Sequence, residues 1–226
     1  ILTPAGASFT TAGGGYDYEM EALEGMDAEI VECPATEEGF IAAAPTADAV
    51  YAKGMKFTSS MIDALVKCKA IVLATVGVDY VDVAAATAKG IPVTNCPDTF
   101  IEEVADHAMM LLLATHRRCI EQDRMVREGR WMEGRPQLLK VPRLMGLTLG
   151  FISFGRVARQ VAKRARPFGL NMLAYDPFVQ ELAMSDYGVQ PATLPEVLRQ
   201  SDFVSMHAPD TASTRRMLTD EHFAQM

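Results

Sequence analysis

The chain alternates between short apolar runs rich in β-branched residues and stretches whose apolar residues recur every three or four positions. In its first part this pattern predicts strands at residues 1–3, 28–32, 49–51, 70–74 and 91–94. It predicts helices at residues 18–24, 37–43, 60–68 and 83–89. Ser59 is the predicted N-cap of the third helix, and Gly90 stops the fourth. Strands and helices in alternation indicate an α/β fold with parallel sheets.

A longer helical pattern follows and predicts one helix at residues 101–126. Its core-facing stripe is predicted to consist of Val104, Ala108, Leu111, Leu112 and Thr115. Gly129, Gly134 and Pro136 then break the pattern, which predicts an extended arm at residues 128–143 around the single tryptophan, Trp131. An arm of this kind suits a subunit interface and favours a homodimer.

A second series of strands and helices begins at Leu147. It predicts strands at residues 147–152, 171–175 and 203–206, and helices at 156–165, at 194–200 and from Thr219 onward. The glycine run at residues 13–15 is interpreted as a mobile loop, because no helix opens directly behind it as a phosphate-binding turn requires. The pattern therefore predicts two doubly wound, parallel-sheet α/β domains, at residues 1–97 and 98–226.

Composition and charge restrict the partners. The formal net charge is -8, which disfavours binding to nucleic acid or to an anionic membrane. The four cysteines form no CxxC pair and have no histidine at metal-ligand spacing, so we expect reduced thiols and no metal site in a cytoplasmic protein. No apolar run is long enough to span a membrane, and no signal peptide is visible. The chain starts inside a predicted strand without an initiating Met, so we expect residues to be missing at its start.

The strongest chemical signal is a strand that runs into a turn and then a helix, at residues 146–159. At the positions of the GxGxxG dinucleotide-binding fingerprint stand Ser153, Gly155 and Ala158. Gly155 holds the position where the backbone approaches the pyrophosphate, and Ala158 is an accepted small residue. Ser153 departs from glycine, and a positive φ there would carry about 1–3 kcal/mol of strain. The free N–H groups of the following helix would face the pyrophosphate.

The next predicted strand ends at Asp176, which is close to the expected spacing for a ribose-binding carboxylate. A carboxylate at this place accepts hydrogen bonds from ribose hydroxyls and repels a 2′-phosphate, and no arginine stands beside it. The motif therefore predicts NAD rather than NADP as the cofactor. A plain βαβ packing turn is the alternative interpretation.

Several further segments, in this order, resemble the D-isomer-specific 2-hydroxyacid dehydrogenase family. They are residues 75–82 (TVGVDYVD), 90–97 (GIPVTNCP), 102–108 (EEVADHA), 129–131 (GRW) and 201–209 (SDFVSMHAP), with Thr211 and Thr214. The resemblance implies an oxidoreductase that transfers a hydride between NAD(H) and a small 2-oxo or 2-hydroxy acid. It also implies a flavodoxin-like substrate-side domain at residues 1–97 and a Rossmann domain at 98–226.

The resemblance further implies roles for individual residues. The backbone at Val76 and Gly77 would hold the substrate carboxylate, a task for which a glycine-containing turn is suited. The cofactor would contact Ser153, Gly155, Arg156, Val157, Asp176, His207, Ala208, Pro209 and Thr214. His207 is interpreted as part of the cofactor wall rather than as a catalytic base. His107 is expected in a packed or cleft-edge position, and His116 and His222 on the surface.

The family's catalytic Arg, Glu and His fall after the position of Met226, so no catalytic residue is assigned within the chain. We therefore expect a polypeptide that ends at Met226 not to turn over 2-oxo acids, and to be unstable or prone to aggregate. An NADH-sensing, corepressor-like binding protein on the same fold is the alternative function, and a non-functional truncated product is a third possibility.

Overall fold

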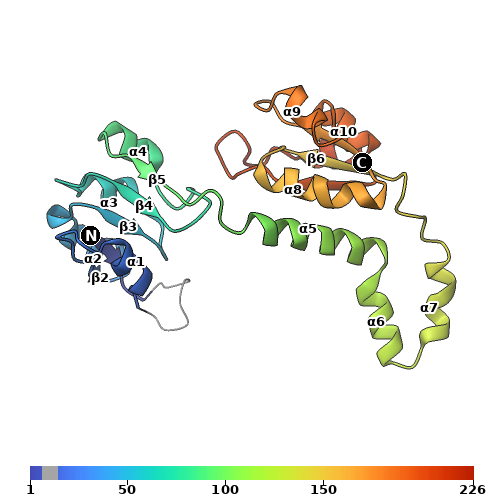
Figure 1. Cartoon of the computed structure of the whole chain (residues 1–226), viewed down its shortest axis with the longest axis horizontal. Coiled ribbons are helices and arrows are strands. Elements are labelled where there is room, and N and C mark those ends of the chain that lie inside the picture. Colours follow the sequence, from blue (N-terminus) through green and yellow to red (C-terminus); the bar gives the residue numbers. More distant parts are fainter. Residues whose placement is uncertain (7–14) are drawn as a thin grey trace. The chain divides into compact units, whose positions relative to one another are not determined.

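The computed structural model describes residues 1–6 and 15–226, which form two compact units, Ile1–Thr99 and Phe100–Met226 (Figure 1). Each unit contains one parallel sheet and its own apolar core. The α/β class with parallel sheets is therefore confirmed. The sequence places the division after residue 97, whereas the compact units divide after Thr99. Gly13 and Gly14 of the predicted loop lie outside the described residues.

The first unit is built on a five-stranded sheet in the order β2-β1-β3-β4-β5. The strands are β1 (Leu2–Pro4), β2 (Val31–Cys33), β3 (Val50–Ala52), β4 (Ile71–Leu73) and β5 (Val93–Thr94). The helices are α1 (Asp17–Ala22), α2 (Glu37–Ala43), the 3-10 turn η1 (Ala44–Thr46), α3 (Ser59–Asp63) and α4 (Val83–Ala88). Val50 and Ala52 face the core under α2, α3 and α4, whereas Tyr51 faces α1 through a hydrogen bond to Glu19. Helices thus cover both faces of the sheet.

Two details of α3 differ from the prediction. The N-cap is Thr58 rather than Ser59, because the Thr58 side chain accepts the hydrogen bond from the Met61 amide. The helix also ends at Asp63, five residues earlier than predicted. The ammonium group of Lys89 donates to the carbonyl oxygens of Ile62, Asp63 and Leu65 at 3.1, 2.7 and 2.8 Å. A distant cation therefore satisfies the carbonyls that a longer helix would have paired.

The second unit contains a four-stranded sheet in the order β8-β7-β6-β9. Its strands are β6 (Thr148–Ile152), β7 (Asn171–Tyr175), β8 (Gln190–Pro191) and β9 (Phe203–Met206). Its later helices are α8 (Arg156–Ala165), the 3-10 turn η2 (Arg166–Phe168), α9 (Glu181–Ser185), α10 (Leu194–Gln200) and α11 (Asp220–Phe223). One core joins the sheet to α8, and a second joins its other face to α10. The sequence missed β8 and α9, which are too short for a periodic signal.

Before this sheet, the predicted single helix is broken in two. Helix α5 (Ile101–His116) is followed by a left-handed Arg118, with φ 52°, which is the N-cap of α6 (Cys119–Arg127). The predicted extended arm is wrong as well, since residues Trp131–Leu138 form helix α7, which packs beside α6 (Figure 1). At Gly134 a Cβ would lie 2.7 Å from atoms of Gln122 and Met125. Glycine is therefore the residue that permits this close helix packing, rather than one that ends the helix.

The core-facing side of α5 matches the predicted stripe only in part: Ala108 and Leu112 pack against the core as predicted. Val104 and Leu111 are 48% and 51% exposed, while Ala105 and Met109 are buried against α8. The buried stripe is turned about one residue from the prediction, because Ala105 and the small residues of α8 allow the two helices to approach closely. His116, predicted on the surface, is buried with its ring 5.5 Å from that of Phe203.

Among residues 1–6 and 15–226, no helix is long and apolar enough to cross a membrane. The same residues contain no cluster of His, Cys, Asp or Glu side chains that could hold a metal ion.

Candidate cofactor-binding site

The predicted cofactor residues follow three neighbouring strands at one edge of the second sheet. Ile152 pairs with Tyr175 on β7 and with Met206 on β9, so the three strands end at the same level. The Ser153 amide donates to Tyr175 and the His207 amide donates to Ile152, which carries the ladder one step beyond the strands. The strand order reverses between β6 and β9. Ligands of open α/β sheets bind at such a switch point, outside the carboxyl ends of the strands.

The turn between β6 and α8 has the geometry that pyrophosphate binding requires. Ser153 adopts φ 71°, the left-handed conformation for which glycine is favoured. Gly155 is the N-cap of α8, and a Cβ built on it would meet no atom within 4 Å. The first turn of α8 contains no acidic residue, and its N-cap makes no side-chain hydrogen bond, so no carboxylate of the helix itself neutralises the positive end of the helix dipole. Ala158 is fully buried, as the close packing of helix and sheet requires.

Asp176, the first residue after β7, faces this turn. Its Oδ2 accepts hydrogen bonds from the Phe154 amide and the Ser153 hydroxyl at 2.8 and 3.1 Å. Its Oδ1 accepts from the amides of Phe178 and Val179 at 2.8 and 3.1 Å. Burial by itself raises the pKa of Asp176, but these hydrogen bonds outweigh it and hold the pKa below its ordinary value. The group is therefore a carboxylate at neutral pH.

The sequence prediction missed the amides of Phe154, Phe178 and Val179 as partners of Asp176. Two of them could have been found, because an aspartate followed by proline often accepts from amides two and three residues later in an Asx turn. The Phe154 amide lies 22 residues earlier in the chain, and only the pairing of β6 with β7 brings it to Asp176.

The loop after β9 contributes the third side of the site. The half-buried imidazole of His207 is hydrogen-bonded through Nε2 to Ser205 Oγ at 2.8 Å, and its ring lies 6.0 Å from that of Phe151. Burial lowers the pKa of His207, so the ring is neutral at pH 7. These contacts fit a wall residue better than a proton-transfer group.

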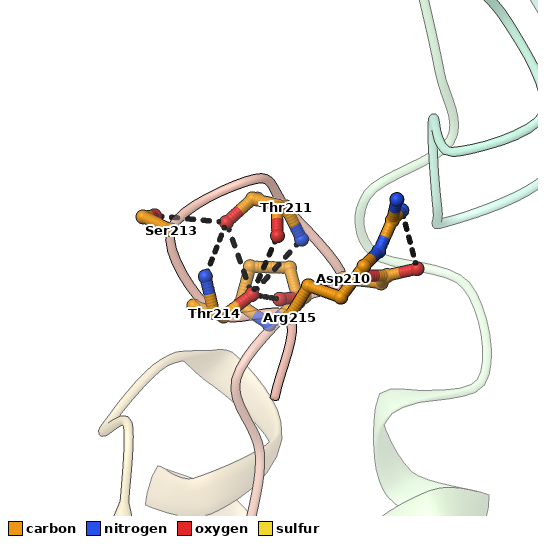
Figure 2. A network of polar contacts seen from close by, with 6 residues as sticks. Asp210, Thr211, Ser213, Thr214 and Arg215 are labelled. Carbon is orange, nitrogen blue, oxygen red and sulfur yellow. Dashed lines mark hydrogen bonds and ion pairs between the residues drawn. The ribbon is translucent and has the colours of Figure 1, made fainter. Parts of the chain in front are cut away.

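Beyond His207 the chain forms a closed polar turn (Figure 2). The hydroxyl of Thr214 donates to the carbonyl of Pro209 and accepts from the Thr211 amide at 2.9 Å. Arg215 pairs with Asp210 at 3.1 Å across the same turn. Thr214 thus holds the backbone at Pro209 in place. Its turn follows directly after His207, Ala208 and Pro209, the residues predicted to form the cofactor wall.

In the first unit, Val76 and Gly77 lie in the loop after β4. The Asn95 side chain donates to the Val76 carbonyl at 2.7 Å, and the Thr75 hydroxyl donates to the Gly77 carbonyl at 2.8 Å. These bonds set the orientation of the peptide groups in an exposed turn. The two residues belong to a different compact unit from the Ser153–Asp176 site.

Comparison with known proteins gives a consistent result. Residues 109–226, slightly more than half of the chain, match the family model described as D-isomer specific 2-hydroxyacid dehydrogenase, NAD binding domain. A glyoxylate reductase from Korarchaeum cryptofilum is 38% identical over 169 residues, which cover 74% of this chain and 51% of that protein. A D-3-phosphoglycerate dehydrogenase from Methanocaldococcus jannaschii is 35% identical over 209 residues, covering 92% and 39%.

Among solved structures, D-lactate dehydrogenase from Aquifex aeolicus, in complex with NAD and lactic acid, aligns with a TM-score of 0.83 and 25% identity. The alignment covers 100% of this chain and 65% of that one. The chain thus spans about half, or less, of the length of the two curated relatives above.

Proposed function

Because this chain belongs to the D-isomer-specific 2-hydroxyacid dehydrogenase family and contains its NAD-binding domain, we propose that the protein transfers a hydride between NAD(H) and a small 2-oxo or 2-hydroxy acid. The relatives named above are a reductase and dehydrogenases of such acids, which supports this class of reaction. No observation favours the corepressor-like alternative. D-isomer specificity follows from the family description and is part of the proposal.

The observation that carries the proposal is the position of Asp176 beside an open, glycine-capped helix N-terminus. Asp176 accepts hydrogen bonds from the adenosine ribose, and its charge repels the 2′-phosphate of NADP. The turn Ser153–Gly155 and the first amides of α8, at Arg156 and Val157, bind the pyrophosphate. NAD, when bound, supplies the hydride-transfer chemistry.

The remaining predicted residues orient the reactants. His207, Ala208 and Pro209 form a wall beside the cofactor, and the turn through Thr214 holds the backbone of that wall. The peptide groups of Val76 and Gly77 bind the substrate carboxylate. His207 is neutral and bonded to Ser205, so we do not assign it the proton transfer.

The sharpest test of cofactor binding is Gly155→Ala. Gly155 has φ −77°, and an added methyl group meets no atom of the chain, so the free energy of unfolding should change by less than about 0.5 kcal/mol. The methyl group enters the space assigned to the pyrophosphate, so the dissociation constant for NADH should rise at least about tenfold. NADH fluorescence titration measures this. Unchanged NADH affinity would contradict the proposed pyrophosphate site.

The reaction itself is tested with the polypeptide that the gene encodes. NADH oxidation is followed at saturating glyoxylate, hydroxypyruvate and pyruvate, with NADPH in parallel. We expect turnover with at least one acid and a preference for NADH. NADH binding without turnover of any 2-oxo acid would support the proposed cofactor site but contradict the proposed reaction.

A further inference from the structure

Both oxygens of the Asp176 carboxylate are already engaged by donors of the chain itself. Oδ1 accepts from the amides of Phe178 and Val179, and Oδ2 accepts from the Phe154 amide and the Ser153 hydroxyl. A carboxylate offers about four lone-pair positions. The four donors therefore occupy the positions that a ribose hydroxyl would need, and cofactor binding at Asp176 requires that one of them leave.

The four donors differ in how easily they can leave. Three are backbone amides, and each is held by the turn that contains it. The Ser153 hydroxyl is carried by a half-buried side chain that rotates about a single bond, and its hydrogen bond of 3.1 Å is no shorter than any of the other three. Rotating this side chain breaks one hydrogen bond and leaves the backbone of the turn unchanged.

Ser153 is also the position where this chain departs from the dinucleotide-binding fingerprint. Its φ of 71° is the conformation that glycine adopts without strain, and a glycine would place no hydroxyl near the carboxylate. The departure thus adds one donor to Asp176 at a site where the fingerprint has none.

We propose that Ser153 sets the affinity of the cofactor site: its hydroxyl holds the Asp176 carboxylate in the free protein and is displaced by an adenosine ribose hydroxyl on binding. This inference rests on the proposed role of Asp176 as the ribose acceptor. Because binding breaks the hydrogen bond between Ser153 and Asp176, the free energy of binding is less favourable by the net contribution of that one bond. Removal of the hydroxyl should therefore tighten binding by about fivefold.

The experiment titrates ADP and 2′,3′-dideoxy-ADP into the wild-type chain, Ser153→Ala and Ser153→Gly by calorimetry. Both variants remove the hydroxyl, but Ser153→Ala keeps a Cβ at the strained φ whereas Ser153→Gly relaxes it. We expect the dissociation constant for ADP to fall about fivefold in both variants and that for dideoxy-ADP to stay unchanged. In an Asp176→Ala background, Ser153→Ala should have no effect on either ligand. Thermal melts of each variant establish that it is folded.

Three results would overturn the proposal. Weaker ADP binding by Ser153→Ala would mean that the hydroxyl orients Asp176 toward the ribose and does not compete with it. An equal gain with dideoxy-ADP would mean that no ribose hydroxyl competes with it. If the wild-type chain binds ADP and dideoxy-ADP equally well, the ribose role of Asp176 fails, and this inference fails with it.

Discussion

Asp176 is the single residue on which cofactor choice is expected to depend. Asp176→Ala removes the ribose acceptor and the charge that repels a 2′-phosphate. Hydrogen bonds to a charged group contribute about 1.5–3 kcal/mol, so NADH should bind roughly tenfold to a hundredfold more weakly. NADPH should lose less affinity, so the difference in affinity between NADH and NADPH should become smaller. Parallel fluorescence titrations measure both, with the exposed Asp186→Ala as control. Unchanged discrimination would contradict this role.

His207 should make the stability of the second unit depend on pH. Burial lowers its pKa in the folded state below the ordinary value of 6.5, so the unfolded chain binds more protons between these two values. Stability is therefore lost as pH falls through about 6.5, and the loss levels off below the folded pKa. His207→Gln should reduce the fall in melting temperature between pH 7.5 and 5.5, by about 2–4 °C for each kcal/mol involved.

The control for this pH dependence is the same substitution at the exposed His107. His107→Gln should leave the pH profile of the melting temperature close to that of the wild-type chain. A profile that is identical in His207→Gln and in the wild-type chain would show that His207 does not cause the dependence.

At the scale of elements, Arg164 links helix α8, on which it lies, to helix α5. Its guanidinium donates to Asp106 and Glu102 of α5, each at 2.5 Å, and its side chain is only 26% exposed. An arginine that pairs with two carboxylates across two helices contributes more to the stability of the fold than an exposed ion pair within one helix. We expect Arg164→Met to lower the melting temperature by about 2–4 °C, corresponding to about 1 kcal/mol.

Arg127 provides the matched comparison for Arg164. It pairs with Asp123 four residues earlier on α6, and its side chain is 76% exposed. Arg127→Met should change the melting temperature by less than about 1 °C, because exposed pairs of this kind contribute little. Equal effects of the two substitutions, or an Arg164 effect that survives 1 M salt unchanged, would contradict an electrostatic tie between α5 and α8.

At the scale of the whole molecule, the α6–α7 hairpin leaves large apolar side chains uncovered. Ile120 and Leu139 are 84% and 81% exposed, and Trp131 is 48% exposed. Large apolar side chains left exposed along one hairpin are typical of interaction surfaces. We expect a second copy of the chain to cover them, so sedimentation should detect a dimer that Ile120→Asp weakens at least tenfold. Val66→Asp, at a similarly exposed position of the first unit, is the control. A monomer at high micromolar concentration with Trp131 fully quenchable would contradict the dimer.

Much of the fold follows from local signals. Helices α2, α8 and α10 and strands β7 and β9 lie at the predicted residues. Their apolar spacing is clear, and α2 and α10 begin at threonine N-caps. Errors gather in the region between Ile101 and Leu138, where neighbours distant in the sequence decide the outcome. Gly129 and Gly134 look alike in the sequence, yet Gly129 follows the end of α6 with φ 70° and Gly134 lies inside α7.

The sequence by itself determined the strand–turn–helix unit, the place of Gly155 at its turn and the place of Asp176 at the end of the next strand. These features depend on a few consecutive residues, whose backbone preferences and apolar spacing act locally. The tertiary structure decided which side of α5 is buried, that His116 is packed against Phe203, and that Ser153 and Phe154 bind Asp176. Each of these contacts joins residues 22 or more positions apart, so it exists only once the sheet has brought its strands together.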